Sequence, residues 1–490
     1  MPLPKPQAIF DRDFEWSELA GFVAEVTPYP TLGVISGRRR QGKSFLLDAL
    51  CRSTDGFYFA ATEGTEAESL RQLGAKIANY RGDQLPYQLA SWDEAIPLLL
   101  RLASQQPIPV VIDEFPFLVK ASSALPSIIQ RELGPQAKPS TSPARLLLCG
   151  SALSFMGSLL SGSAPLRGRA GLELMVSTFD YRLAARFWEF TDPKLALLNN
   201  AIVGGTPAYR REYARDDTPA DLDDFSSWVT RTVLNPARPL FREARYLLAE
   251  EPRLQDHALY HTLLAAIAAG NRTRGKIANY LDRKSTDLAH PLTLLEDVGL
   301  ITREVDIFHS NRSNYRIAEP LVTFYHAIMR PEWGALERPG RAAEVWHRSE
   351  ARFLSQVVGP HFEELCRQWA RWFASAESFS GHPHQVGRGT VADPARKTNY
   401  EVDVVVVGAE QEGRQRVLSI GEAKWNQVIG IPHLERLQHI KELLQNHPTL
   451  DASHARLACY SGAGFTSELR MVAAAGEVQL VDLARLYNDD

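Results

Sequence analysis

The stretch 32-LGVISGRRRQGKSFLLDAL-50 decides the fold of the N-terminal part of the chain. A short apolar run leads into Gly37, and a polar segment continues through Gly42, Lys43 and Ser44 into an apolar pattern typical of a helix. This is the spacing G-x-x-x-x-G-K-[ST] in the strand–loop–helix context that it requires. The glycines let backbone N–H groups curl around phosphate, and the helix N-terminus adds the positive end of its dipole. The stretch therefore predicts a phosphate-binding loop, or P-loop.

A second apolar run supplies the acids that a nucleotide site needs. Residues 110–112 read Val-Val-Ile, as in a buried parallel strand, and Asp113 and Glu114 follow at its carboxyl end, where open α/β sheets bind ligands. Lys43 would neutralise the β- and γ-phosphates of a nucleotide, while Ser44 and Asp113 would hold Mg²⁺. Glu114 would orient or deprotonate the attacking water. Adjacent acids of this kind predict nucleotide hydrolysis rather than binding alone.

Further motifs accompany the P-loop. A third apolar strand ends at Ser151, whose hydroxyl would sense the γ-phosphate; a simple strand-to-turn serine is the alternative. The motifs GRRRQGKS and VVIDEF, with four further stretches, resemble the archaeal-type P-loop ATPases, which are relatives of the STAND and AAA+ groups. The four further stretches are IFDRDFEWSEL (9–19), LLLCGSALSFM (146–156), LRGRAGLEL (166–174) and VGGTPAYRREY (203–213).

The resemblance to these ATPases implies roles for residues that the spacing alone does not assign. ATP would be the bound nucleotide, Arg12 would lie beside it, and Pro207 in a lid would approach its base. An arginine after the third strand would act as an arginine finger, and Arg167 and Arg169 are the matching positions. Ordinary surface charge is the alternative for both arginines.

The middle of the chain has the pattern of short helices followed by a hairpin. Residues 256–270, 272–282 and 286–300 read as helices, and 301–320 reads as a two-stranded wing. This order predicts a winged-helix domain. Its basic residues would contact phosphates of DNA, or the domain would only pack beside the ATPase as a spacer. They are Arg272, Arg274, Lys276, Arg283 and Lys284.

The last 140 residues carry an acid and an amine close together on one strand. The runs 400-YEVDVVVV-407 and 416-RVLSIGEAK-424 are separated by a polar turn, which predicts a β-hairpin. Because strand side chains alternate between faces, Glu422 and Lys424 would point the same way. Asp403 precedes Glu422 by 19 residues and adds a second acid. A same-face ion pair at a strand end is the ordinary alternative.

Two acids and a lysine at such a place have the chemistry of a metal-dependent hydrolytic site. Asp403 and Glu422, with a backbone carbonyl, would hold one or two Mg²⁺ or Mn²⁺ ions against a scissile phosphate. Lys424 would position the attacking water or stabilise developing charge. An acid on the preceding helix, Glu363 or Glu364, would complete the metal ligands.

The order helix, strands, helix, strand around D…ExK resembles the restriction-endonuclease-like, or PD-(D/E)xK, nuclease superfamily. The resemblance implies a metal-dependent deoxyribonuclease with DNA as its partner. The chain departs from the named pattern because Val402, and not proline, precedes Asp403. A nuclease-like fold kept for binding or scaffolding, with vestigial acids, is the alternative.

Composition sets limits on the classes of protein to consider. The net charge of −4 gives no global basic signature, so any nucleic-acid affinity must come from local patches. The four cysteines show no CxxC spacing, which argues against a zinc ribbon or a disulfide framework. No window approaches 18 uninterrupted apolar residues, and no leader pattern begins the sequence, so we expect a cytoplasmic protein that does not span a membrane.

The sequence therefore predicts an α/β protein with a P-loop NTPase parallel sheet, a helical lid, a winged-helix domain and a C-terminal restriction-endonuclease-like α/β domain. The expected division is ATPase 1–200, lid 201–254, winged helix 255–318, linker 319–350 and nuclease-like domain 351–490. ATP hydrolysis would gate or power DNA cleavage, with genome defence or DNA repair as the suggested setting and a homo-oligomer as a candidate assembly. The rival prediction is a nucleotide-switched, STAND-like signalling or DNA-binding scaffold protein that cleaves nothing.

Overall fold

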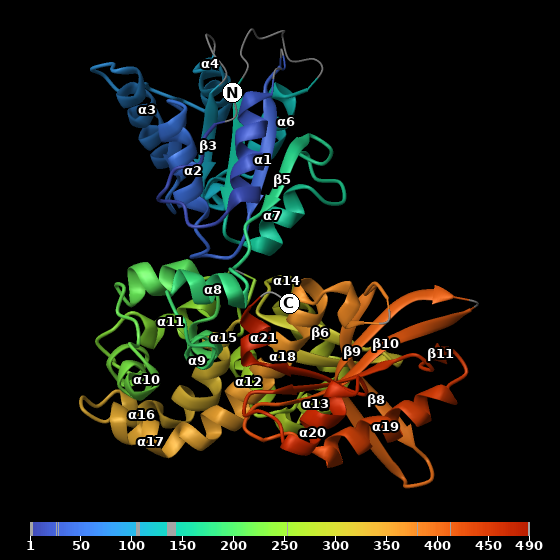
Figure 1. Cartoon of the computed structure of the whole chain (residues 1–490). Coiled ribbons are helices and arrows are strands. Elements are labelled where there is room, and N and C mark those ends of the chain that lie inside the picture. Colours follow the sequence, from blue (N-terminus) through green and yellow to red (C-terminus); the bar gives the residue numbers. More distant parts are fainter. Residues whose placement is uncertain are drawn as a thin grey trace. The chain divides into compact units, whose positions relative to one another are not determined.

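The computed structural model describes residues 3–25, 27, 29–103, 108–134, 144–251, 253–379, 381–411 and 413–488. The chain divides into two compact units, Met1–Thr178 and Phe179–Asp490 (Figure 1). The expected boundary at residue 200 is wrong, because it falls inside α9 (Pro193–Val203), a helix whose residues from Leu195 onward are all buried in the second unit.

The first unit is built on a five-stranded parallel sheet of order β2-β3-β4-β1-β5. The strand predicted at 110–112 is β3, and it is buried along its whole length. Because all five strands are parallel, their carboxyl ends share one edge of the sheet, and the P-loop lies there directly after β1. The strands are β1 (Thr31–Ser36), β2 (Phe57–Ala60), β3 (Pro109–Asp113), β4 (Arg145–Gly150) and β5 (Ala170–Met175).

Helices cover both faces of this sheet, as a parallel sheet requires (Figure 1). One face packs against α1 and α2, with Trp16 and Leu47 in its core. The other face packs against the remaining helices, with Trp92 and Phe115 in its core. The helices are α1 (Asp13–Ala24), α2 (Lys43–Ser53), α3 (Glu66–Arg81), α4 (Trp92–Arg101), α5 (Phe115–Ala121), α6 (Leu125–Glu132) and α7 (Leu153–Leu159).

The second unit begins with a group of helices. Segments expected in the lid (201–254) are helical, and they pack with α9 and with later helices of the same unit. A ring cluster including Phe225, Trp346 and Phe353 joins this group to the segment predicted as a linker. The helices are α8 (Tyr181–Phe187), α9, η1 (Tyr209–Tyr213), α10 (Leu222–Trp228), η2 (Val229–Val233) and α11 (Leu240–Ala249).

The segment predicted as a winged helix has helices and a hairpin in the expected order. The tip of its hairpin packs against a later strand, since Ile307 N–H donates to the Arg388 carbonyl at 2.9 Å. A Cβ on Gly389 would collide with the Phe308 ring, so glycine at this position lets the tip approach the strand. The elements are α12 (His257–Ala268), α13 (Arg274–Leu281), η3 (Ser285–Leu288), α14 (Ala289–Asp297), β6 (Ile301–Asp306) and β7 (His309–Ile317).

The linker expected at 319–350 is wrong, because this segment is helical and largely packed. Leu321, Phe324 and Ile328 are fully buried. Its prolines and glycines occupy places that helices tolerate: Pro320 starts the first helix and Gly340 lies between two helices. The elements are α15 (Pro320–Phe324), η4 (Tyr325–Met329), η5 (Arg330–Glu332), α16 (Trp333–Leu336) and α17 (Ala342–Arg352).

Residues 342–373 are continuously helical, although Gly359 and Pro360 lie among them. Wider π-helical turns lie just before Gly359 and at the end of the helix. A π-bulge changes the hydrogen-bond pattern of the preceding turn, which gives the proline ring and its missing N–H a place inside the helix. After α17 the elements are η6 (Phe353–Val358), α18 (Gly359–Gln368) and η7 (Trp369–Phe373).

The C-terminal part is a mixed sheet of main order β13-β12-β10-β9-β8, with β11 paired to β10. The predicted hairpin is confirmed, because β9 and β10 pair antiparallel, with Gly421 opposite Val404. Helix α18 packs on β9 and β10. The elements are η8 (Ala376–Ser378), β8 (Gln385–Asp393), β9 (Thr398–Gln411), β10 (Arg414–Lys424), α19 (Ile431–Gln445), β11 (Leu450–Asp451), β12 (Arg456–Ser461), α20 (Ser467–Ala474), β13 (Gln479–Asp482) and α21 (Leu483–Tyr487).

A buried charge network ties the β6–β7 hairpin to α18. Arg316 pairs with Glu304 at 2.8 Å and with Glu364 at 3.4 Å. Arg367, with a side chain only 3% exposed, pairs with Glu364 at 2.9 Å and donates to the Asp403 carbonyl at 3.0 Å. Burial alone would raise the pKa of Glu364, but Arg316 and Arg367 lower it to about 2. The hairpin and the C-terminal sheet are therefore joined by paired charges as well as by apolar contacts.

Replacing Arg367 with methionine should reveal how much this network contributes. The change leaves the buried Glu364 carboxylate with one weaker partner, so we expect the free energy of unfolding of the second unit to fall by about 3–5 kcal/mol. Arg348→Met is the matched control, since Arg348 forms exposed ion pairs that contribute about 0–1 kcal/mol. Calorimetric unfolding of the full chain measures both, and equal shifts would contradict a stabilising network.

Candidate functional site

The P-loop has the backbone that phosphate binding requires. Gly37 and Gly42 have φ values of 148° and 91°, which residues with a Cβ rarely adopt. A Cβ on Gly37 would also collide with the Val176 carbonyl oxygen. Helix α2 begins at Lys43 after Gly42, and no side chain caps it. Its first N–H groups are therefore left for an anionic ligand.

The side chain of Lys43 folds back over the P-loop that precedes it. Its side chain is buried, and Nζ donates to the carbonyls of Gly37 and Arg38, both at 2.7 Å. Burial lowers the pKa of the Lys43 ammonium, while the nearby Cys149, Glu114 and Asp113 act in the opposite direction. The ammonium is thus held at the P-loop and faces the acids that follow β3.

Asp113 lies at the end of β3 among hydroxyl and thiol donors. Tyr58 donates its hydroxyl to Asp113 Oδ2 at 2.6 Å. Burial alone would raise the Asp113 pKa, but hydrogen bonds outweigh this effect and hold it below the usual value; they come from Cys149, Ser44 and Tyr58. The contact with Ser44 joins the two side chains predicted as Mg²⁺ ligands. A hydroxyl and an ionised carboxylate are oxygen donors that fit this ion.

Glu114 is positioned by an unusual backbone and by one side-chain partner. Its φ of 51° lies in the left-handed region, and its N–H donates to Asp113 Oδ1 at 2.9 Å. Ser151, which is 4% exposed, has Oγ at 3.1 Å from both carboxylate oxygens of Glu114. Ser151 therefore contacts the acid at the third strand, whereas a direct contact with a γ-phosphate stays a prediction.

The ATPase resemblance implied further residues beside ATP, and the structure places them in different parts of the chain. Arg12 is buried; it donates to the carbonyls of Gln41 and Ser177, at 3.3 and 2.6 Å, and so ties the P-loop to the end of the unit. Arg169 is exposed just before β5. Pro207 belongs to the second unit, just before η1. Their predicted roles beside ATP stay predictions.

The acids of the second unit meet on the paired strands β9 and β10. Lys424 Nζ lies 2.7 Å from Glu422 Oε1 and 3.6 Å from Asp403 Oδ2. The Ala423 N–H donates to Asp403 Oδ2 at 2.9 Å. Arg436 of α19 forms a further ion pair with Glu422. The sheet thus brings together all three residues that sequence spacing singled out, and Arg436 is a fourth that it missed.

Glu363 and Glu364, the two glutamates proposed as metal ligands on the preceding helix, have different surroundings in the structure. Glu364 is engaged by Arg316 and Arg367, as described above. Burial and the neighbouring Asp403 carboxylate raise the pKa of Glu363, which identifies Glu363 as the glutamate of α18 that faces the acids. A carboxyl group whose pKa is raised by a neighbouring carboxylate lies within reach of the field of that carboxylate. Glu363 is therefore the better candidate for a shared cation.

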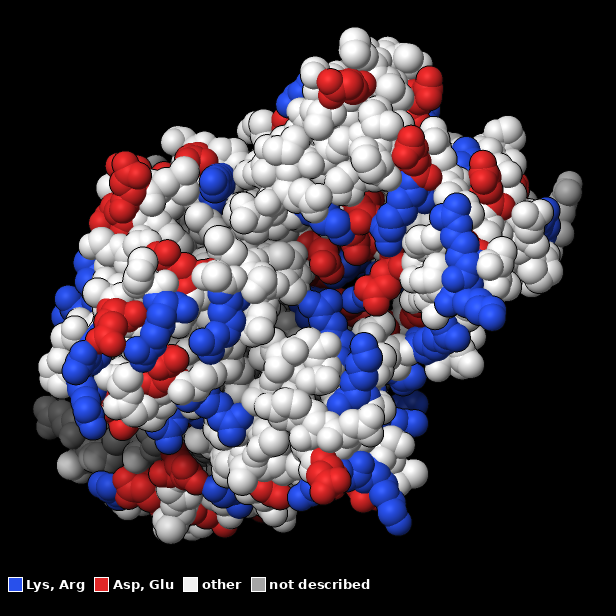
Figure 2. Space-filling view, turned by 90° about the horizontal axis from the view of Figure 1, so that it is seen from below, with Lys and Arg blue, Asp and Glu red and all other residues white. Residues whose placement is uncertain are grey.

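The donor types suit a divalent cation, although cationic side chains now neutralise them. Carboxylate oxygens are ligands that Mg²⁺ and Mn²⁺ prefer. In the part of the chain that the structure describes, no three His, Cys, Asp or Glu side chains are grouped closely enough to hold a metal ion. The Glu422 carboxylate instead forms ion pairs with Lys424 and Arg436. Such mixing of charge is visible on the surface, where a hollow holds Lys and Arg beside Asp and Glu (Figure 2).

Comparisons with known proteins show distant similarity. No protein-family model matches the chain. An uncharacterized protein of Methanocaldococcus jannaschii is 26% identical over 341 residues, which are 69% of this chain and 72% of that protein. Among solved structures, the Walker-type ATPase PABY2304 of Pyrococcus abyssi covers 66% of this chain and 98% of its own, with 21% identity and a TM-score of 0.48. The Aeropyrum pernix ORC2 protein in ADPNP–ADP complexes covers 66% and 89%, with 16% identity and a TM-score of 0.39.

No helix among the described residues has the length and apolar character to cross a membrane.

Proposed function

We propose that the first unit binds ATP with Mg²⁺ and hydrolyses the γ-phosphate. The observation that carries this proposal is the meeting of Lys43, Ser44 and Asp113 at one edge of the parallel sheet, beside the phosphate-binding loop. In this arrangement the ammonium neutralises phosphate charge, and the hydroxyl and carboxylate hold the ion. Glu114, next to Asp113, orients the attacking water and takes its proton.

Lys43→Ala tests the nucleotide site directly. Removal of a charge-assisted contact to phosphate should weaken ATP binding at least about tenfold and abolish hydrolysis. Binding is measured with a fluorescent ATP analogue and hydrolysis by phosphate release. Lys76→Ala is the matched control, because Lys76 is exposed on α3 away from the loop. Equal ATP affinity in the two variants would refute the proposed site.

The second unit supports a second candidate function, metal-dependent cleavage of DNA. The specific observation is that Lys424 contacts the buried Glu422 of its own strand and Asp403 of the adjacent strand β9. Asp403 and Glu422 would hold the cation, which would supply Lewis-acid activation of the phosphodiester. Lys424 would lie beside the scissile phosphate and stabilise the charge that develops on it. Arg436 would hold the Glu422 carboxylate in place through their ion pair.

Cleavage of labelled single-stranded, duplex and branched DNA tests this second function. Cutting should require Mg²⁺ or Mn²⁺ and stop with EDTA, and lanes with and without ATP show whether the nucleotide activates or restrains it. If no DNA is cut under any condition while ATP is hydrolysed, the rival reading is favoured: a nucleotide-switched signalling or scaffold protein.

A further inference from the structure

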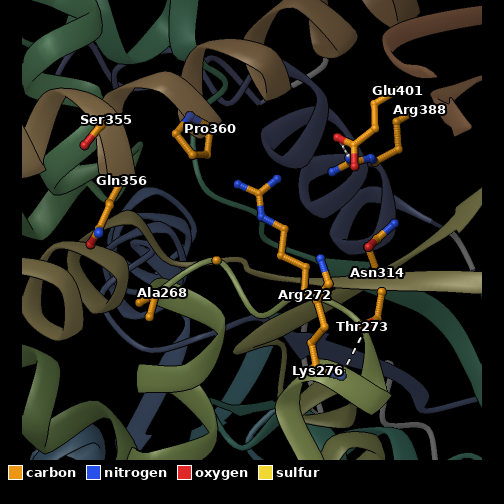
Figure 3. A pocket seen from close by; sticks show the side chains of 12 residues that line it. Ala268, Arg272, Thr273, Lys276, Asn314, Ser355, Gln356, Pro360, Arg388 and Glu401 are labelled. Carbon is orange, nitrogen blue, oxygen red and sulfur yellow. Dashed lines mark hydrogen bonds and ion pairs between the residues drawn. The ribbon is translucent and has the colours of Figure 1, made fainter. Parts of the chain in front are cut away.

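A pocket lies where the helix–hairpin segment meets the C-terminal sheet. It has a volume of about 250 Å³, and its wall comes from segments that are distant in sequence. Figure 3 shows basic side chains from two of them, Arg272 and Lys276 from one segment and Arg388 from β8. The residues that the argument uses are Arg272, Thr273, Lys276, Arg388 and Glu401.

Arg388 is the most informative side chain of this pocket. It is 8% exposed, and its NH2 group lies 3.0 Å from Glu401 Oε2. Its NH1 atom is buried and has no hydrogen-bond partner among the described residues. Leaving a charged donor unpaired in this way costs more than an ordinary hydrogen bond returns. The guanidinium is therefore suited to an additional anionic acceptor in the pocket.

The other polar groups of the pocket favour the same kind of ligand. Among the described residues, the acidic side chain that forms an ion pair with Arg272 is Glu363, at the long distance of 3.9 Å. Lys276 is exposed in the first turn of α13, where Thr273 caps the helix by accepting the Lys276 N–H. The positive end of the α13 dipole therefore faces the site. Three basic side chains against one carboxylate, Glu401, give the pocket a positive balance.

The pocket lies beside the acidic cluster. Glu401 and Asp403 lie two residues apart on β9, in a stretch where the pairing with β8 shifts register between Val402 and Val405. Two residues along a strand span about 7 Å. This is close to the rise of two nucleotides, since each strand of a duplex rises about 3.4 Å per nucleotide. The distance from the pocket to the acids therefore suits a strand that places one phosphate in the pocket and a nearby phosphate at Asp403 and Glu422.

We propose that this pocket binds a backbone phosphate of a nucleic-acid strand, held by Arg388, Arg272 and Lys276. Its role in placing a neighbouring phosphodiester before Asp403 and Glu422 rests on the second proposed function. The binding step itself involves no divalent ion and no nucleotide, so it can be measured separately from cleavage.

Binding of the full chain to fluorescein-labelled DNA, single-stranded and duplex, tests the proposal in EDTA without ATP. Arg388→Gln and Lys276→Gln should each weaken binding about tenfold. Each should also reduce the slope of log affinity against log salt by about one. Arg388→Lys should keep part of the affinity. Lys194→Gln removes the same charge as Lys276→Gln from an exposed position at the start of α9 and should bind as wild type. Unchanged melting temperatures exclude misfolding.

Three results would overturn the assignment. The first is wild-type protein that does not bind DNA, and the second is an equal loss in Lys276→Gln and Lys194→Gln. The third is Arg388-dependent binding of inorganic phosphate in calorimetry without any DNA binding, which would show a pocket for small phosphate compounds. Failure of the cleavage function looks different: the pocket variants would still lose affinity, while wild type binds DNA and leaves it uncut.

Discussion

Glu114→Gln is expected to lower kcat for ATP hydrolysis by about 100-fold or more while leaving ATP affinity nearly unchanged. Glutamine keeps the size of the side chain and can still accept from Ser151, but it cannot take a proton from water. The binding groups, Lys43 and Ser44, are untouched. A variant that binds but does not hydrolyse is therefore the expected result.

The structure explains why Glu114, and not Asp113, should carry the proton step. Asp113 accepts hydrogen bonds from its neighbours, which lower its pKa. A carboxylate with a lowered pKa is a good ligand for a metal ion but a weak base toward water. The Glu114 carboxylate accepts from the Ser151 hydroxyl, and the residue is half-buried. Glu18→Gln, on the exposed part of α1, is the matched control. Wild-type turnover in Glu114→Gln would remove Glu114 from the mechanism.

Lys424→Ala is expected to reduce DNA cleavage by about 100-fold or more, since it removes the cation beside the reacting phosphate. DNA binding through the neighbouring pocket should persist. Lys424 is 35% exposed on its side chain, so its removal should leave the fold intact. Lys194→Ala provides the control for the loss of one lysine from the same unit.

The same cleavage assay separates control by ATP from the chemistry of cutting. Lys43→Ala removes nucleotide binding without touching the second unit, so any change in its cutting rate reports coupling between ATP and cleavage. Cutting that survives in Lys424→Ala would assign the activity to a contaminant or to another site. The assignment of Asp403, Glu422 and Lys424 would then be wrong.

Local spacing was sufficient to predict the parts of the molecule that neighbouring residues determine. The P-loop follows from a motif of eight residues, and its strand and helix are where the apolar runs placed them. The β9–β10 hairpin follows from alternation and a polar turn, so Asp403 was expected near Glu422. In both places, short-range spacing along the chain determines which side chains lie close together.

Long-range packing decides the features that the sequence did not reveal. Pro320 and Gly340 suggested a linker, yet both occupy helix boundaries in a packed segment. Arg436 reaches Glu422 from a separate helix, and no spacing rule connects the two. The choice of Glu363 over Glu364 depends on Arg316, which comes from the β6–β7 hairpin. Tertiary contacts of this kind are invisible to local pattern.

The most direct test of the whole account is anomalous scattering from Mn²⁺ in crystals of the Glu114→Gln protein grown with ATP. The account predicts ATP on the P-loop with one ion at Ser44 and Asp113, and a second ion at Asp403 and Glu422. An empty second position would contradict metal-dependent cleavage and favour the nucleotide switch. Absence of nucleotide and ion from the P-loop would contradict the central claim that this chain hydrolyses ATP.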